Sequence, residues 1–219
     1  MMLVFFWSPP AICQDSEGPS DSPLIQAIWE KDLSRARAIV AQGVNPNARD
    51  RFRDTALGEA IAVGLSDFAE ELVNAGADPN LMEDGGTTPL MQAAWNCNLR
   101  VAKFLLNHGA QLHAVNYGGE SALMQAAYAC TQGEMTKFLI QASARIDASD
   151  KSGHTALTLA ADNGNFQAVK ELLLAGANVS IKNDDGQTAE NLACGRDVGR
   201  EPGHDRVCEL LRNTSRRDK

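Results

Sequence analysis

A Ser or Thr recurs along this chain at an almost constant interval, and this regularity limits the fold more than any other feature. The recurring residues are Ser22, Thr55, Thr88, Ser121, Thr155 and Thr188. The intervals between them are 33, 33, 33, 34 and 33 residues. A second set repeats with the same period: Gly43, Gly76, Gly109, Ser143 and Gly176. Such a period is typical of solenoids, in which copies of one supersecondary unit stack side by side.

The two recurring positions predict where helices begin and end. A Ser or Thr side chain caps a helix by accepting a hydrogen bond from a backbone N–H two or three residues later, and Pro89 suits the first helical position. Alanine pairs such as Ala93 and Ala94 then allow a short helix to pack closely. An apolar cluster later in each unit predicts a second, longer helix. It ends at the recurring Gly, so Ser143 should cost about 1 kcal/mol relative to Gly.

On these residues the chain resembles the ankyrin-repeat family, whose unit has about 33 residues and the pattern T-P-L-H-x-A. The best copy is TPLMQAA at residues 88–94, and the resemblance extends from about Ser22 to Arg212. It implies an all-α solenoid of stacked helix-turn-helix units with short β-hairpin fingers. The family's usual His is replaced by Gly58, Met91, Met124 and Thr158. Its internal hydrogen bond should therefore be missing, which predicts less rigid turns.

The chain is expected to have four segments. Residues 1–13 carry no charge and hold a short apolar run, which resembles the tail of a secretory signal; an apolar, disordered leader is the alternative. Residues 14–21 should be a flexible linker and 214–219 a disordered basic tail. The repeat domain spans 22–213. It has five repeats and a cap with a long loop from Gly195 to His204, and these units start near Ser22, Thr55, Thr88, Ser121, Thr155 and Thr188.

Composition and charge exclude several functional classes. The 20 basic and 28 acidic residues give a net charge of −8, the wrong sign for a phosphate-binding surface, so nucleic acid is not an expected partner. No run of 18 apolar residues occurs, so no stable membrane insertion is expected after removal of the leader. The chain also lacks a phosphate-binding Gly-rich loop, a Cys-x-x-Cys pair and a G-x-S-x-G sequence. We therefore predict no enzyme activity, no cofactor and no metal site.

Four of the five cysteines remain if the leader is removed, and they form two candidate pairs. Cys194 and Cys208 flank the loop of the cap; a disulfide there would contribute about 3 kcal/mol, and two buried thiols are the alternative. Cys97 and Cys130 occupy the same turn in adjacent copies. Stacked copies are about 10 Å apart, beyond the ~7 Å that a disulfide spans, although an inserted residue near Thr131 would shorten the gap. Two small buried side chains are therefore the favoured expectation for this second pair.

The placement of the aromatic residues suggests a binding surface. Burial on the second helices explains Phe68, Phe104, Phe138 and Phe166. Trp29, Trp95 and Tyr128 instead share one repeat position at the exposed end of the first helix, with Ala62 and Asp162 in the other copies. In the family that this chain resembles, this position faces a concave groove. Phe52 and Tyr117 fall in finger tips.

Trp and Tyr with Arg at the edge are typical of binding hot spots. We therefore predict that these residues contact a partner: Trp29, Arg51, Phe52, Trp95, Asn96, Tyr117, Tyr128, Lys151 and His154. The alternative is that Trp95 and Tyr128 only stack on each other to cover the layer of first helices.

The sequence thus predicts a non-catalytic scaffold, expected to be a monomer, that binds another protein through the groove and fingers. The leader and the even cysteine count favour a periplasmic or secreted protein that regulates or sequesters an enzyme there. If the leader is not a signal, the protein is cytoplasmic. The alternative function is a cytosolic or secreted host-interaction effector with free thiols, and an enzyme is the least favoured class.

Overall fold

The structure is a computed structural model that describes residues 22–195 and 202–215. The expected leader (1–13) and linker (14–21) lie outside these residues. Twelve α-helices follow one another in the described ranges as six consecutive pairs. The first helices of the pairs are α1 (Pro23–Trp29), α3 (Ala56–Ala62), α5 (Pro89–Trp95), α7 (Ala122–Ala129), α9 (Ala156–Asp162) and α11 (Ala189–Cys194). The second helices are α2 (Leu33–Ala41), α4 (Ser66–Asn74), α6 (Leu99–Asn107), α8 (Glu134–Gln141), α10 (Phe166–Leu174) and α12 (Pro202–Ser215).

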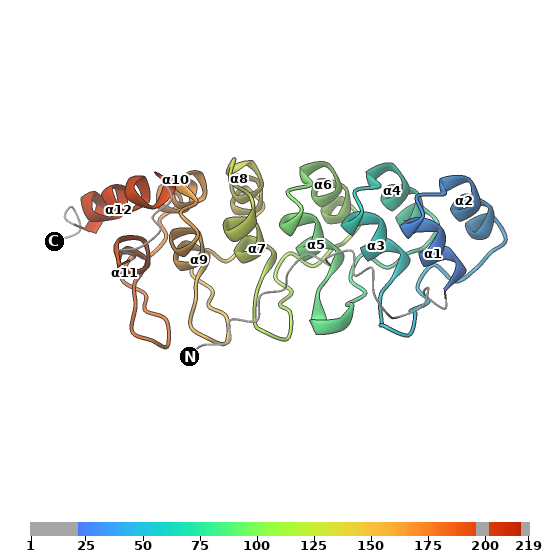
Figure 1. The fold of residues 1–219 in the computed structure, drawn as a ribbon, viewed down its shortest axis with the longest axis horizontal. Coiled ribbons are helices and arrows are strands. Elements are labelled where there is room, and N and C mark those ends of the chain that lie inside the picture. The colour runs from blue at the N-terminus through green and yellow to red at the C-terminus, as the bar shows by residue number, and fades with distance from the viewer. Residues whose placement is uncertain (1–21, 196–201, 216–219) are drawn as a thin grey trace.

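The pairs stack side by side into an elongated array (Figure 1). The second helices form one row and the first helices form another, and the fingers project beyond the first helices. Each first helix packs on its own second helix and on the first helix of the next pair, as α5 does with α6 and α7. This is the all-α repeat solenoid that the sequence predicts.

The recurring hydroxyl residues do begin the first helices. All six are N-caps whose side-chain oxygen accepts a hydrogen bond from the backbone N–H three residues later. Three second helices begin in the same way, at Asp32, Asn98 and Asn165. Because most of these helices have only seven to nine residues, a single cap fixes a large share of each one's length.

The core runs continuously through the array. The alanine pairs of α5, α7 and α9 are fully buried where first helices meet. Of the phenylalanines that the structure describes, only Phe68 is fully buried; Phe104, Phe138 and Phe166 are half-buried, which corrects the expectation from sequence. In α6 the buried stripe is Val101, Ala102 and Leu105, and Phe104 lies at its edge.

The fingers are minimal hairpins. Single antiparallel bridges close three of them, at Arg49–Thr55, Val115–Ser121 and Ser149–Thr155, while a 3₁₀ turn (Asp84–Gly86) forms another. Neighbouring fingers are joined by backbone hydrogen bonds: Tyr117 N–H to Gly85 O (2.8 Å), Lys151 N–H to Gly118 O (2.9 Å) and Asp184 N–H to Ser152 O (3.0 Å). At Gly119, φ is +86° and an added Cβ would lie 3.0 Å from the Lys151 backbone nitrogen, so glycine allows this close approach.

The cap differs from the expectation in two respects. Its second helix begins at Pro202, before the end of the loop expected from Gly195 to His204, so Cys208 lies in the middle of α12 and not at its start. The helix also continues through Thr214 and Ser215, where a disordered tail was expected to begin. The Thr214 hydroxyl donates to the Leu210 carbonyl oxygen (3.0 Å). Residues 216–219 lie outside the described part of the chain.

Other side chains replace the family's missing His. The backbone N–H of Thr155 donates to the Thr158 hydroxyl (2.7 Å), and that of Ser121 lies 3.4 Å from the Met124 sulfur. In the cap, the N–H of Thr188 donates to the Asn191 amide oxygen (3.0 Å). The prediction that this bond would be missing is therefore wrong at the turns of Met124 and Thr158, because the third helical residue still supplies an acceptor.

Ser143 provides a test of the helix-ending position. It adopts φ +73°, in the same left-handed region as Gly43, Gly76, Gly109 and Gly176. A side chain in this conformation costs about 1 kcal/mol that Gly avoids. We expect Ser143→Gly to raise the free energy of unfolding by about 1 kcal/mol, measured by urea denaturation. Ser143→Ala should give no such gain and Gly109→Ser a comparable loss; equal effects of Gly and Ala at 143 would contradict this explanation.

Candidate protein-binding surface

The predicted aromatic position lies at the ends of the first helices. Trp29, Ala62, Trp95 and Asp162 are the last residues of α1, α3, α5 and α9, and Tyr128 is the last but one of α7. We call these five residues the helix-end row. Because the pairs stack in register, one residue of the row comes from each of five successive pairs. The row therefore crosses the solenoid from one tier to the next.

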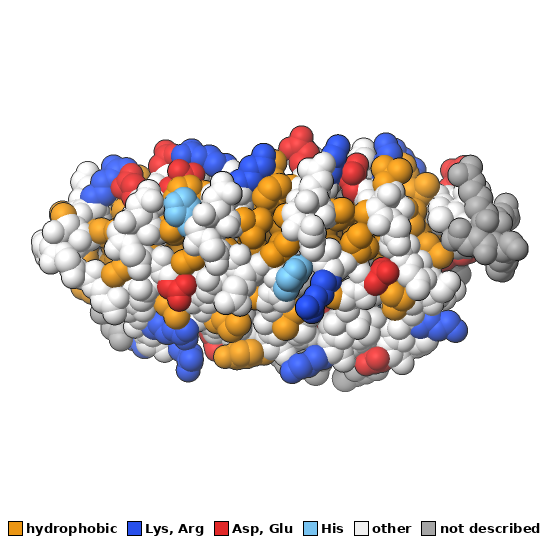
Figure 2. Space-filling model, turned by 180° about the vertical axis from the view of Figure 1, so that it is seen from behind, with side chains coloured by type: hydrophobic (Ala, Val, Ile, Leu, Met, Phe, Trp, Pro, Cys, Tyr) orange, Lys and Arg blue, Asp and Glu red, His pale blue; other side chains and the backbone are white. Residues whose placement is uncertain are grey.

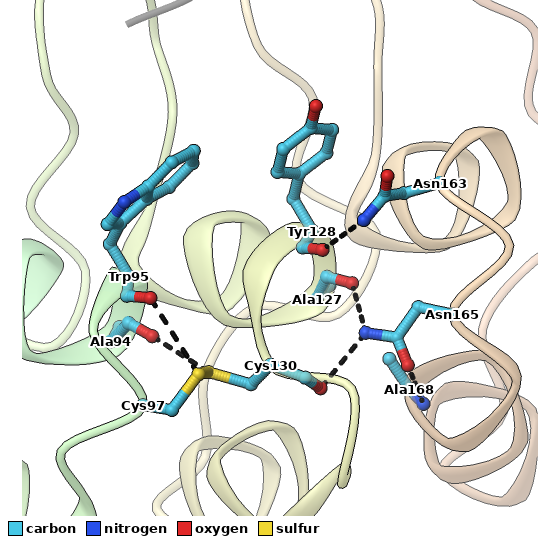
Figure 3. The surroundings of a disulfide bond; sticks show 9 residues. All are labelled: Ala94, Trp95, Cys97, Ala127, Tyr128, Cys130, Asn163, Asn165 and Ala168. Carbon is cyan, nitrogen blue, oxygen red and sulfur yellow. Dashed lines mark hydrogen bonds between the residues drawn. A yellow bond between two sulfur atoms is a disulfide. The ribbon is translucent and has the colours of Figure 1, made fainter. Parts of the chain in front are cut away.

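Trp95 and Tyr128 form the centre of the row. Their rings are stacked, with centroids 5.6 Å apart and planes at 15°. Figure 3 shows both rings projecting in the same direction from their helices. Both residues are half-buried. The alternative that they stack on each other is thus realised, but the stack remains open to solvent on part of its surface.

Trp29, the outer aromatic of the row, is 38% exposed. Its indole Nε1–H donates to a carboxylate oxygen of Glu59 on the neighbouring helix α3 (2.6 Å). Ala62 separates it from the stacked pair, so the row holds one isolated Trp and one aromatic pair.

A disulfide bond lies beneath the stacked pair. Cys97 and Cys130 are bonded with their Cα atoms 5.5 Å apart, so the expected spacing of about 10 Å is wrong. Cys97 has the left-handed backbone (φ +54°) of its equivalents Gly64 and Gly164. Cys130 instead has φ −93° and ψ +94°, because α7 continues to Ala129 before the inserted residue. This different turn brings Cys130 within bonding distance of Cys97 in the neighbouring repeat.

Asparagine side chains fix the helix ends on which the aromatic residues lie. The Asn163 amide donates to the Tyr128 carbonyl oxygen (2.7 Å), and the buried Asn165 amide donates to the carbonyl oxygens of Ala127 and Cys130 (2.9 Å each). Asn96, a predicted contact residue, donates to the Ile61 carbonyl oxygen (3.1 Å). Each of these bonds reaches from one repeat to the previous one, so the row is held rigidly across repeats.

The finger residues predicted to contact a partner differ in exposure. Tyr117 is 62% exposed, and its ring packs against the α-carbon of Gly86 in the preceding finger. Lys151 and Arg51 are also exposed, and the Arg51 guanidinium lies 4.7 Å from the centre of the half-buried Phe52 ring.

His154 is less available than its finger neighbours. Its Nδ1 lies 3.4 Å from an Asp150 carboxylate oxygen, and its Nε2 lies 3.2 Å from the Asn183 amide nitrogen. The hydrogen bond to Asp150 raises the pKa of His154.

An acidic cluster near Trp29 was not predicted. At the start of the other fingers, Asp or Asn side chains accept backbone hydrogen bonds within their own finger, as Asp50 does from Phe52 and Asp54. Glu83 occupies this position in the finger between α4 and α5. Its carboxylate instead accepts from the backbone N–H (2.9 Å) and hydroxyl (3.0 Å) of Thr55, the N-cap of α3.

Gly58 makes this contact possible. A Cβ at residue 58 would overlap the Glu83 carboxylate. Glu83 therefore occupies the space left by the absent side chain and supplies the acceptor that the family's His would provide. The missing side chain at Gly58, together with the longer Glu in place of Asp or Asn at position 83, was the signal in the sequence.

The carboxyl groups around Glu83 titrate abnormally. Burial raises the pKa of Glu83 and of Glu59 to about 7, against the opposing hydrogen bonds from Thr55 and Trp29. Burial and repulsion from Asp50 raise the pKa of Asp54 to about 6. Glu83, Glu59 and Asp54 thus share one poorly solvated region, which Trp29 adjoins through its hydrogen bond to Glu59.

The opposite edge of the molecule has a different character. Along the second helices, basic and acidic side chains alternate, as Figure 2 shows from behind. Arg37 pairs with Glu71 (2.7 Å), and Arg100 pairs with Asp67 (2.7 Å) and Glu70 (2.8 Å). These exposed pairs contribute little to stability and form no patch of a single sign.

The described residues were also compared with the requirements of a metal site and of a membrane-spanning helix. Within 22–195 and 202–215, no three His, Cys, Asp or Glu side chains converge as a metal-binding group. None of the helices in those ranges has the length and apolar character needed to cross a bilayer.

Comparison with protein families agrees with the fold. A family profile described as "Ankyrin repeats (3 copies)" matches residues 24–116 and 123–216, and a second, "Ankyrin repeats (many copies)", matches residues 96–140. The chain belongs to the ankyrin-repeat family. Ankyrin repeats mediate binding to other proteins and are generally non-catalytic, so this chain is a protein–protein interaction scaffold.

The raised pKa of Glu83 predicts a pH-dependent stability. Between about pH 4.5 and 7 the folded protein keeps a proton that the unfolded chain releases, so this group lowers stability as the pH rises through that window. We expect Glu83→Gln, which keeps an oxygen acceptor for Thr55, to match the wild type at about pH 5. At about pH 8 it should be more stable by about 1 to 2 kcal/mol, allowing for the partial exposure of the group.

Urea midpoints measured at both pH values test this prediction. Glu134→Gln, which replaces an exposed carboxyl group on α8, is the matched control. Its difference in unfolding free energy from the wild type should be the same at both pH values. A Glu83→Gln variant that loses stability equally at both pH values would refute the role of ionisation.

Proposed function

We propose that this chain binds another protein through its helix-end row and finger tips. Trp29, Trp95 and Tyr128 are the anchors, and the polar or aromatic residues around them complete the surface. These surrounding residues are Arg51, Phe52, Asn96, Tyr117, Lys151 and His154. In the family, this side of the solenoid forms the concave groove.

The observation that carries the proposal is the half-exposed stack of Trp95 and Tyr128 on adjacent helices. Large aromatic side chains bury much area at little entropic cost and are enriched among hot spots. This stack is also pre-organised, because Asn163, Asn165 and the Cys97–Cys130 disulfide fix the backbone below it. A rigid surface loses less conformational freedom on binding, which favours affinity.

The fingers extend the same surface. Tyr117, at 62% exposure, is among the most exposed large side chains of the described residues. Its backbone N–H is bonded to Gly85 and the next tip, at Lys151, is bonded to Gly118, so these tips have fixed relative positions. The partner should therefore meet aromatic anchors along the helix ends and polar contacts along the tips, in a docking mode that needs little rearrangement.

We also propose that the protein works in the periplasm or outside the cell, where it regulates or sequesters an enzyme. Two cysteine pairs at bonding distance support this location, since disulfides persist in oxidising compartments and are rare in the cytosol.

A thiol titration under denaturing conditions tests the location. Protein purified from its source without added reductant should carry zero or one free thiol, because Cys97, Cys130, Cys194 and Cys208 are paired. Four or five free thiols would exclude an oxidising compartment and favour the cytosolic effector.

Affinity capture from the source organism tests the surface. The Trp95→Ala, Tyr128→Ala double variant should lose the protein that the wild type captures, with a binding loss of about 30-fold or more for the isolated partner. Leu174→Ala removes a 73% exposed side chain from α10 and is the matched control. Unchanged capture by a double variant that melts at the wild-type temperature would place the binding surface elsewhere.

A further inference from the structure

The Cys97–Cys130 disulfide has one accessible end and one buried end. Cys97 is exposed, whereas Cys130 is 3% exposed and belongs to the core. In thiol–disulfide exchange, a thiolate must reach one of the two sulfur atoms, so access decides which of them is attacked. Of the two bonded residues, Cys97 is the exposed one, so a reagent from solvent should reach its sulfur first.

The environment of the Cys130 sulfur can accommodate a free thiol after the disulfide opens. The Cys130 sulfur lies 3.0 Å from the Ala94 carbonyl oxygen, as Figure 3 shows. A thiol at this position can donate its S–H to that oxygen, so opening the bond does not create an unsatisfied buried group. A thiolate here would be in the apolar core, which favours its uptake of a proton.

The two sides of the disulfide differ in how their backbone is held. The carbonyl oxygen of Cys130 accepts from the buried Asn165 amide, which holds that side independently of the sulfur. Cys97 keeps a left-handed backbone (φ +54°) at a position where Gly64 and Gly164 are found in other repeats. A non-glycine residue is disfavoured in this conformation, so opening the bond removes a restraint from a turn whose backbone is unfavourable for Cys.

We propose that the Cys97–Cys130 disulfide is a thiol–disulfide exchange site for an external thiol, attacked at the Cys97 sulfur, and that its opening changes the Trp95–Tyr128 stack. This inference is independent of the identity of any partner.

The reaction balances with a thiol as the only co-reactant. The external thiolate forms a disulfide with Cys97 as the Cys97–Cys130 bond breaks, and the electron pair stays on the Cys130 sulfur, which takes a proton from water. With a dithiol, the second thiol displaces Cys97. The dithiol is then oxidised to a disulfide and the protein pair is reduced to two thiols.

The stack responds because each ring lies two residues before a cysteine of the bond. Trp95 is the last residue of α5, and Cys97 comes two residues after it. Tyr128 lies at the end of α7, and Cys130 comes two residues after it. The bond is thus a covalent link between the two helix ends that carry the rings, and opening it removes one restraint on the position of Trp95 relative to Tyr128.

The site of attack is tested with glutathione on the folded, oxidised full chain. Cys13→Ser removes the fifth cysteine from the assay. After brief reaction at about pH 8, where thiolates form, the sample is acidified, alkylated and analysed by peptide mass spectrometry. Glutathione should be found on Cys97, with Cys130 alkylated, before any modification of Cys194 or Cys208. Glutathione on Cys130, earlier opening of Cys194–Cys208, or reaction only under unfolding conditions would overturn the proposal.

The effect on the stack is tested by tryptophan fluorescence before and after reduction with dithiothreitol. A Cys194→Ala, Cys208→Ala variant restricts the change to one bond. Its emission should change on reduction, and the change should be absent when Trp95→Phe is added, because Trp7 and Trp29 lie away from the bond in sequence. An emission change that persists with Trp95→Phe, or no change at all, would refute the link between the disulfide and the stack.

Discussion

The contact between neighbouring first helices is the interaction on which the structure depends. These helices are short, and alanine pairs at 0% exposure line the seam where they meet. Because a methyl group is small, the helix axes come close together, and each repeat buries its apolar side against the next. A single pair of such helices has too little core to fold alone. The same close stacking places one helix-end residue per tier in a row, so the surface proposed for binding is a direct product of the packing.

Polar bonds between repeats give this stack its fixed register. Asn96, Asn163 and Asn165 each donate to a carbonyl oxygen of the previous repeat. Backbone hydrogen bonds also join the tips at Tyr117, Lys151 and Asp184 to the tips before them. Glu83 adds a further link by reaching into the space above Gly58. The Glu83 carboxylate supplies the acceptor that the family's His would provide. Using Glu83 in place of His brings an additional carboxyl group into the acidic cluster. This is unfavourable because a charged carboxylate loses more solvation energy on burial than a neutral imidazole.

Features that repeat along the chain could be predicted from the sequence, and features that depend on an exception could not. The caps at Thr55 and Thr88 follow from local backbone chemistry that any copy must satisfy. The Cys194–Cys208 bond, with Cα atoms 5.1 Å apart, follows from a helical hairpin. The Cys97–Cys130 bond depends on how one inserted residue reshapes a turn, which spacing alone does not reveal. The partial exposure of Phe104 likewise depends on small rotations of α6, since the residue lies at the edge of its buried stripe.

The fingers are aligned by their backbone, whereas the side chains at their tips determine which partner they can contact. The links that Tyr117, Lys151 and Asp184 make to the preceding tips each join a backbone N–H to a backbone carbonyl oxygen, a bond that every amino acid except proline can make. Side chains such as those of Tyr117 and Lys151 can therefore be exchanged while the tips keep their alignment, provided that glycines such as Gly119 stay. A chain built in this way can acquire a new partner by a few substitutions at the tips, at almost no expense to its fold.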